Sequence, residues 1–209
     1  MPSVFITLEG GEGAGKSTLL KGLVPALVAR GIDVVATREP GGSPLAETVR
    51  SLVLNPPAGE DWSPMAEALL MNAARSDHID KVIGPSLAAG KAVISDRYSD
   101  STRVYQAAGA GVPRAHLLAM EEIVTADARP DLTLILDAAP EDLLARRQDR
   151  NAPTDAFESR DLAFHTAIRN GFLAIAEAEP ERCLVLNAMA QPARILERAL
   201  GAIDNRLRL

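Results

Sequence analysis

The segment GGEGAGKS, residues 10–17, follows the apolar run VFITL of residues 4–8 and precedes leucines at helical spacing. It matches G-x-x-x-x-G-K-[ST], and a strand before it and a helix after it are the context in which this motif binds phosphate. We predict a loop whose backbone N–H groups surround the phosphates of a nucleoside triphosphate, aided by the helix dipole. The positions expected to bind ATP are Gly10, Gly11, Glu12, Gly13, Ala14, Gly15, Lys16, Ser17 and Thr18.

Within this loop, Lys16 is expected to reach the β- and γ-phosphates, and the Ser17 hydroxyl to ligate Mg²⁺. A glycine-rich structural turn is the alternative. The loop itself is common to GTPases, motor ATPases and small-molecule kinases. The sequence has no guanine-specifying N-K-x-D motif, and neither the strand-end acidic pair nor the larger domain of a motor ATPase is evident. A kinase needs a second site, for the acceptor of the phosphoryl group.

Short apolar runs alternate with helical patterns along the chain, and this alternation predicts the fold class. Nearly continuous apolarity is typical of strands buried on both faces of a parallel sheet. We expect strands at 4–8, 33–37, 92–95, 132–136 and 183–186, and helices at 19–28, 63–90, 112–127, 140–148, 157–178 and 191–207. The prediction is therefore an α/β fold, a doubly wound, five-stranded parallel sheet with helices on both faces, in a single domain spanning 1–209.

Arginines lie where a second anion site would form. Arg38 ends the second expected strand, Arg97 follows the third, and Arg75 lies in MNAAR. Ligands of such sheets bind beyond the carboxyl ends of the strands, and the arginine fork suits phosphate. Asp96 precedes Arg97 and is well placed for a metal-bound water, or else simply pairs with Arg97. Because a nucleoside monophosphate is largely dianionic at pH 7, lysine, arginines and Mg²⁺ suffice for phosphoryl transfer without a general base.

Charge and composition narrow the partners and the compartment. The net charge of −6 argues against non-specific nucleic-acid binding, which needs a basic face. No apolar run approaches the length of a membrane span, and no signal peptide is visible. The single cysteine, Cys183, excludes an intrachain disulfide framework and favours a reducing compartment. These features predict a cytoplasmic protein with no nucleic-acid or membrane partner.

Several motifs, taken together, resemble those of bacterial thymidylate kinases. They are LEGGEGAGKST, TREPGG with AETVRSLVL, the AAR of MNAAR, DRYSDSTRVYQ and RPDLTLILD, and they occur in family order over most of the chain. The resemblance implies a P-loop NTPase-like kinase fold, the substrates ATP and dTMP, Mg²⁺ as cofactor, a homodimer, and a short lid at about 147–158.

The resemblance also implies roles for individual residues. Glu12 matches an acidic residue near the deoxyribose 3′-hydroxyl and the metal-bound waters, Tyr105 a tyrosine that disfavours ribonucleotides, and Arg75 an arginine that contacts thymine. Arg38 and Arg97 match neighbours of the acceptor phosphate. The implied dTMP-binding residues are Glu12, Arg38, Pro40, Met71, Arg75, Arg97, Thr102, Tyr105 and Gln106.

Two positions depart from the family pattern. Met71 stands where relatives carry a phenylalanine that stacks on thymine, and Ala156 stands where they carry a lid arginine over the transferred phosphate. Arg147, Arg150 and Arg160 flank the second gap, and Arg150 is the expected replacement and the fourth catalytic candidate beside Lys16, Glu12 and Arg97; the alternative is that all three are solvated charges. Two rival functions stay open: a nucleoside monophosphate kinase with altered base preference, and a P-loop ATP-binding regulatory protein.

Overall fold

The computed structural model describes residues 3–57, 60–126, 128–148, 157 and 159–207. In this part of the chain, five parallel strands form one sheet in the order β2-β3-β1-β4-β5, as predicted. The strands are β1 (Val4–Gly10), β2 (Val34–Arg38), β3 (Ala92–Asp96), β4 (Leu132–Asp137) and β5 (Cys183–Asn187).

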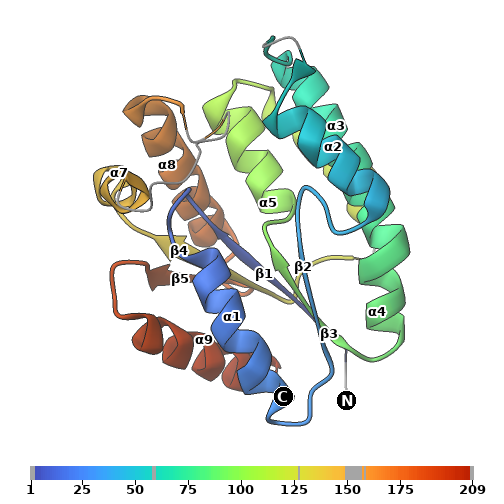
Figure 1. The fold of residues 1–209 in the computed structure, drawn as a ribbon, viewed down its shortest axis with the longest axis vertical. Helices are drawn as coiled ribbons and strands as arrows, with labels where there is room; N and C mark the ends of the chain where they lie inside the picture. The colour runs from blue at the N-terminus through green and yellow to red at the C-terminus, as the bar shows by residue number, and fades with distance from the viewer. Residues whose placement is uncertain (1–2, 58–59, 127, 149–156, 158, 208–209) are drawn as a thin grey trace.

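Helices cover both faces of the sheet (Figure 1). Alternate residues of the central strand β1 explain why. Ile6 and Leu8 pack in a core with Leu23 of α1 (Lys16–Val28) and Ile203 of α9 (Pro192–Leu207). Phe5 points to the opposite face and meets Tyr98 edge-on, with 4.8 Å between ring centroids. The sheet is therefore buried on both faces, and this accounts for the continuous apolarity of its strands.

The strand register brings the expected site residues to one edge of the sheet. Asp96 at the end of β3 pairs with Leu8 of β1 on one side and with Arg38 of β2 on the other. Because all the strands are parallel, the loop that leaves β1 begins beside Asp96, with Arg38 one strand further along the same edge. A phosphate loop and the proposed acceptor residues consequently share the carboxyl edge of the sheet.

The expected helix at 63–90 is observed in three pieces. It consists of α3 (Pro64–His78), a π-helical segment η2 (Ile79–Ile83) and α4 (Gly84–Ala88). The α-helical pattern gives way to the π-helical one at Ile79 and resumes at Gly84, next to Pro85. Proline lacks an N–H group for the helical ladder, so regular α-helical bonding is interrupted at this point.

The helix expected at 157–178 begins later than predicted, and two helical segments were not expected. The observed helix is α8 (Leu162–Ala178). The carboxylate of Asp161 accepts the N–H of Phe164 at 2.8 Å and caps the first turn, so the helix starts after Asp161 and not at residue 157. The sequence patterns did not indicate α2 (Pro44–Leu54), or α5 (Ser99–Thr102) with the π-helical segment η3 (Arg103–Gly109). The helices α6 (Arg114–Thr125) and α7 (Pro140–Gln148) lie where expected.

Among the described residues, no helix combines the length and apolarity needed to cross a membrane. Most of the expected lid, residues 149–156 and 158, lies outside the described residues, and so do Arg150 and Ala156.

Candidate active site

The phosphate loop depends on glycine where it leaves β1. Gly10 has a φ of 130°, and a Cβ built on it would lie 2.3 Å from the carbonyl oxygen of Leu136 in β4. Only glycine combines this backbone conformation with so close an approach. Gly15, with a φ of 97°, stands at the N-terminus of α1, which has no side-chain cap. The first N–H groups of α1 are therefore available to an anion.

Lys16 extends along this loop. Its Nζ donates to the carbonyl oxygens of Gly10 and Gly11, both at 3.0 Å. Burial lowers the pKa of Lys16, and the neighbouring positive charge of Arg97 lowers it further. The lysine head group thus lies at the loop in an environment where an additional negative charge is stabilising.

Two cavities meet at the phosphate loop. One, of about 370 Å³, is lined by all nine residues expected to bind the acceptor and also by Lys16, Ser17 and Asp96. The other, of about 410 Å³, is lined by Ala14, the start of α1, Arg146 and the segment 188–196. Gly13, Gly15 and Thr18 line both cavities, so the loop and the first turn of α1 form the wall between them. We call the first the acceptor cavity and the second the donor cavity.

Arg97 lines the acceptor cavity and contacts several of its other residues. Its Nη2 contacts Glu12 Oε1 at 2.5 Å and the Tyr105 hydroxyl at 3.0 Å, and its Nη1 donates to Gly10 O and to the Ser101 hydroxyl. Burial disfavours the guanidinium charge, but Glu12, Tyr105 and Glu9 outweigh burial and raise its pKa. Its φ of 72° is rare for a residue other than glycine, and backbone strain of this kind is concentrated at functional sites.

Glu9 is a buried carboxyl group that the sequence analysis did not single out. Its Oε1 accepts the N–H groups of Tyr98 and Ser101 at 2.8 and 3.2 Å, and its Oε2 contacts the Ser101 hydroxyl at 2.6 Å. Burial and the nearby charge of Asp100 raise the pKa of Glu9 to about 7, although Arg97, Ser101 and Tyr98 oppose the shift. Glu9 therefore braces the turn that carries Arg97. A charged residue directly after the apolar run of β1 was the sequence feature that could have identified Glu9.

One wall of the acceptor cavity comes from the end of β2, the turn that follows it and α2. Arg38 Nη2 pairs with Glu47 of α2 at 2.9 Å, and the Arg38 side chain is 56% exposed. The Glu39–Pro40 peptide bond is cis, and Pro40 O accepts Nη1 of Arg50 at 2.9 Å. Arg50 also lines the cavity and was not among the expected residues, although it lies in the quoted segment AETVRSLVL.

The opposite wall comes from α3, α5 and η3. Arg75 is 3% exposed and donates to the hydroxyl of Thr102 at 2.9 Å. Gln106 donates to Glu67 at 2.7 Å. Met71 lines the cavity and packs in the core cluster that contains Tyr105. The structure thus brings together residues from four segments that are distant in the sequence.

Ser17 and Asp96 are adjacent, as a shared metal ion would require. The Ser17 hydroxyl donates to Asp96 Oδ2 at 2.9 Å. A hydroxyl and a carboxylate are hard oxygen donors of the kind that Mg²⁺ accepts, and Mg²⁺ commonly takes only one or two protein ligands beside phosphates and water. The described residues contain no group of three or more His, Cys, Asp or Glu side chains that could hold a metal by themselves.

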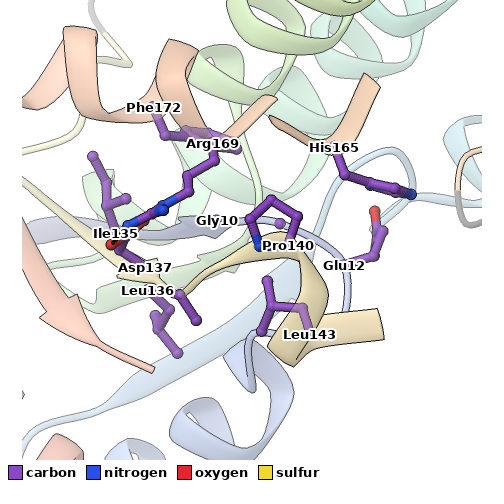
Figure 2. A pocket seen from close by; sticks show the side chains of 12 residues that line it. Gly10, Glu12, Ile135, Leu136, Asp137, Pro140, Leu143, His165, Arg169 and Phe172 are labelled. Atoms are coloured by element: carbon purple, nitrogen blue, oxygen red, sulfur yellow. Dashed lines mark hydrogen bonds and ion pairs between the residues drawn. The ribbon is translucent and has the colours of Figure 1, made fainter. Parts of the chain in front are cut away.

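A small cavity of about 20 Å³ lies on the other side of residues 10–12 (Figure 2). Asp137 at the end of β4 and Arg169 of α8 point toward each other there and form a two-pronged ion pair at 2.7 and 2.9 Å. His165 and Glu12 lie at the opposite end of the view. The ion pair ties α8 to the strand beside the phosphate loop.

A phosphate loop at the carboxyl edge of a parallel sheet, flanked by two cavities of which one is lined with arginines, defines a P-loop protein with room for two ligands. A family model described as thymidylate kinase matches residues 8–199, and the chain belongs to that family. The thymidylate kinase of Caulobacter vibrioides is 49% identical over 98% of both chains. That of Pseudomonas fluorescens is 48% identical over 97% of this chain and 95% of the relative.

A solved structure agrees with these sequence comparisons. The crystal structure of thymidylate kinase from Ehrlichia chaffeensis is similar with a TM-score of 0.78 and 32% identity, over 98% of this chain and 99% of that one. The predicted family and P-loop kinase fold are confirmed, and neither rival function is favoured.

Proposed function

We propose that the protein transfers the γ-phosphoryl group of ATP to dTMP and so forms ADP and dTDP. The observation that carries this proposal is the acceptor cavity, where the phosphate loop and all nine residues expected to bind dTMP line one space. A regulatory protein that only holds ATP would have no use for a second cavity lined by Arg38, Arg75 and Arg97.

In the proposed reaction, a phosphate oxygen of dTMP attacks the γ-phosphorus, and the bond from the γ-phosphorus to the β–γ bridging oxygen breaks. The acceptor phosphate is largely dianionic near neutral pH, because its second pKa is about 6, and needs no general base. Lys16 and Arg97 supply positive charge on either side of the transferred group. Glu12, bonded to Arg97 and to the Tyr105 hydroxyl, holds the arginine and faces the acceptor sugar.

Mg²⁺ is the proposed cofactor. Ser17 and Asp96 are the residues that would hold it, directly or through a bound water, and the ion would neutralise charge on the β- and γ-phosphates. Ser17 and Asp96 both line the acceptor cavity.

Recognition of the acceptor is divided between the two walls of its cavity. Arg38, Arg97 and the turn at Pro40 are proposed to contact the phosphate. Arg75, Thr102 and Gln106 are proposed to contact thymine, with Met71 packing on the ring through its thioether. The ring of Tyr105 is held by Phe157 and Phe172 at centroid distances of 5.5 and 6.3 Å, and a fixed ring at the sugar would exclude a 2′-hydroxyl.

The donor cavity is proposed to hold the adenosine of ATP. Ala188, Ala190 and Pro192 line it. They belong to NAMAQP, residues 187–192, which resembles the family segment that lines the adenine pocket. Arg150 is proposed as the replacement for the lid arginine. Near-normal turnover of the Arg150→Ala variant would remove it from that role.

We also propose a homodimer that works in the cytoplasm. Exposed apolar side chains support a dimer interface: Leu69 of α3 is 54% exposed and Ile123 of α6 is 80% exposed. The single-domain organisation with a lid at about 147–158 stays a proposal as well.

A coupled ADP-release assay tests this function across the acceptors dTMP, dUMP, UMP, CMP, AMP and GMP. The proposal expects the highest kcat/KM for dTMP. Preference for another monophosphate would favour the drifted kinase, and ATP binding without any turnover would favour a regulatory protein.

A further inference from the structure

The guanidinium group of Arg75 is almost fully occupied by protein acceptors. Within the described residues, four of its five N–H groups donate to side-chain or backbone oxygens. The acceptors are Glu39 Oε2 at 2.8 Å, Asn72 Oδ1 at 3.2 Å, Tyr98 O at 3.2 Å and Thr102 Oγ1 at 2.9 Å. One N–H of Nη1 is left, and Arg75 is one of the residues that line the acceptor cavity.

Glu39 is shared between Arg75 and a buried histidine. While its Oε2 accepts from Arg75, its Oε1 lies 3.0 Å from Nδ1 of His78. Since a carboxylate only accepts hydrogen bonds, Nδ1 carries the proton. In the neutral ring Nε2 is then an acceptor, and it lies 2.7 Å from the hydroxyl of Thr37.

The contacts that link Arg75, Glu39 and His78 are buried inside the protein. His78 is fully buried and Glu39 is 4% exposed. The backbone of Gly42 presses against the ring, since a Cβ built there would lie 2.3 Å from His78 Nε2. His78 therefore cannot turn away from Glu39 without moving the segment that follows β2.

Arg75 and Glu39, which are bonded to each other, lie in different walls of the acceptor cavity. Arg75 belongs to the wall proposed to recognise the base, and Glu39 precedes Pro40 in the wall proposed to hold the phosphate. A fixed Glu39 thus sets the position of Arg75 relative to the phosphate-side turn.

We propose that His78 is a positioning residue for base recognition: through Glu39 it fixes the Arg75 guanidinium so that a single N–H is offered to a carbonyl oxygen of the acceptor base. This inference rests on the proposed binding of dTMP beside Arg75. One donor suits the O4 carbonyl of thymine, whereas cytosine presents an amino group at that position.

Two substitutions of His78 separate its two contacts. In His78→Asn the side-chain amide can replace Nδ1 as donor to Glu39, and the bond to Thr37 is lost. In His78→Gln the amide reaches the Nε2 position and keeps the bond to Thr37, and the bond to Glu39 is lost. The exposed His116 provides matched controls, His116→Asn and His116→Gln.

We expect His78→Gln to raise the KM for dTMP about tenfold, the order of effect of one lost bond to a charged group. Its kcat and its KM for ATP should stay within about twofold of wild type, and His78→Asn and both controls should behave like wild type. A purely structural role for His78 would instead reduce the folded fraction and hence kcat in both variants, with KM unchanged. That pattern, or an unchanged KM for dTMP in His78→Gln, overturns the proposal.

Glu39→Asp provides a second route if His78→Gln does not fold, because the shortened carboxylate withdraws from Arg75 and His78 together. It should raise the KM for dTMP selectively, and an unchanged KM overturns the proposal. The Arg75→Met variant separates this inference from the proposed function. If Arg75→Met leaves the KM for dTMP unchanged, the proposed base contact of Arg75 is wrong; if it raises KM while His78→Gln does not, only the role of His78 is wrong.

Discussion

Replacement of Glu9 by glutamine should change the way in which stability depends on pH. Glu9 is fully buried and its pKa is raised from 4.5 to about 7. Glutamine resembles the protonated carboxyl group: its oxygen can accept the N–H groups of Tyr98 and Ser101, and its amide can donate to the Ser101 hydroxyl. The substitution thus keeps the shape and removes the titration.

The direction in which the free energy of unfolding changes with pH follows from proton binding. Between pH 4.5 and 7 the folded protein holds a proton on Glu9 that the unfolded chain has lost, so the free energy of unfolding falls as pH rises through this window. One pKa unit corresponds to about 1.4 kcal/mol, so ionised Glu9 costs about 3 kcal/mol well above pH 7. Glu9→Gln lacks this cost, and its stability relative to wild type should rise by about 2 kcal/mol between pH 5.5 and pH 8.

Urea denaturation of both proteins at several pH values measures this difference. Glu122→Gln is the matched control, since it removes the same charge from a side chain that is 74% exposed. A difference between Glu9→Gln and wild type that stays constant, or that falls with pH, would refute the reasoning.

Three further substitutions test other parts of the structure. Lys16→Met should lower kcat by at least about 100-fold in the ADP-release assay, because the positive charge at the phosphate loop is lost; activity within tenfold of wild type would contradict this. Gly42→Ala should destabilise the protein by roughly 2 kcal/mol or more in urea, because its φ of 86° and the 2.3 Å approach to His78 exclude a Cβ; Gly31→Ala, with a φ of 80° and open space around it, is the control and should cost less. Asp100→Asn should cost about 3 kcal/mol, because Asp100 is buried and pairs with Arg182 through both of its oxygens at 2.7 and 2.8 Å; a thermal midpoint equal to that of wild type would contradict it.

Local patterns were sufficient to predict the sheet and most of the helices. The apolar runs became strands because helices bury both faces, as Phe5 and Ile6 illustrate on opposite sides of β1. By contrast, α5 and η3 lacked an apolar stripe, because they bury polar side chains such as Asp100, Thr102 and Gln106. The Ser43–Pro44 pair at the start of α2 was a usable start signal, since Ser43 caps the helix and proline is favoured at the first helical position.

The candidate site was predictable as a set of residues but not as a set of contacts. Parallel strands bring Arg38, Asp96 and the phosphate loop to one edge, and this follows from the alternation of elements. The partners of Glu9 and His78 are distant in the sequence. Tyr98 is 89 residues from Glu9, and Glu39 and Thr37 are 39 and 41 residues from His78. Such pairings depend on how α3 and the turn after β3 pack, and no local pattern specifies that.

The most direct test of the proposed function is to follow a label from the γ-phosphate of ATP into the products. The protein is incubated with dTMP, Mg²⁺ and ATP labelled at the γ-phosphate, and the products are separated. We predict that the label appears in dTDP, at its β-phosphate, in the same amount as the ADP formed. Label that appears only in inorganic phosphate, or that stays in ATP, would contradict the central claim that the two cavities bring donor and acceptor together for direct phosphoryl transfer.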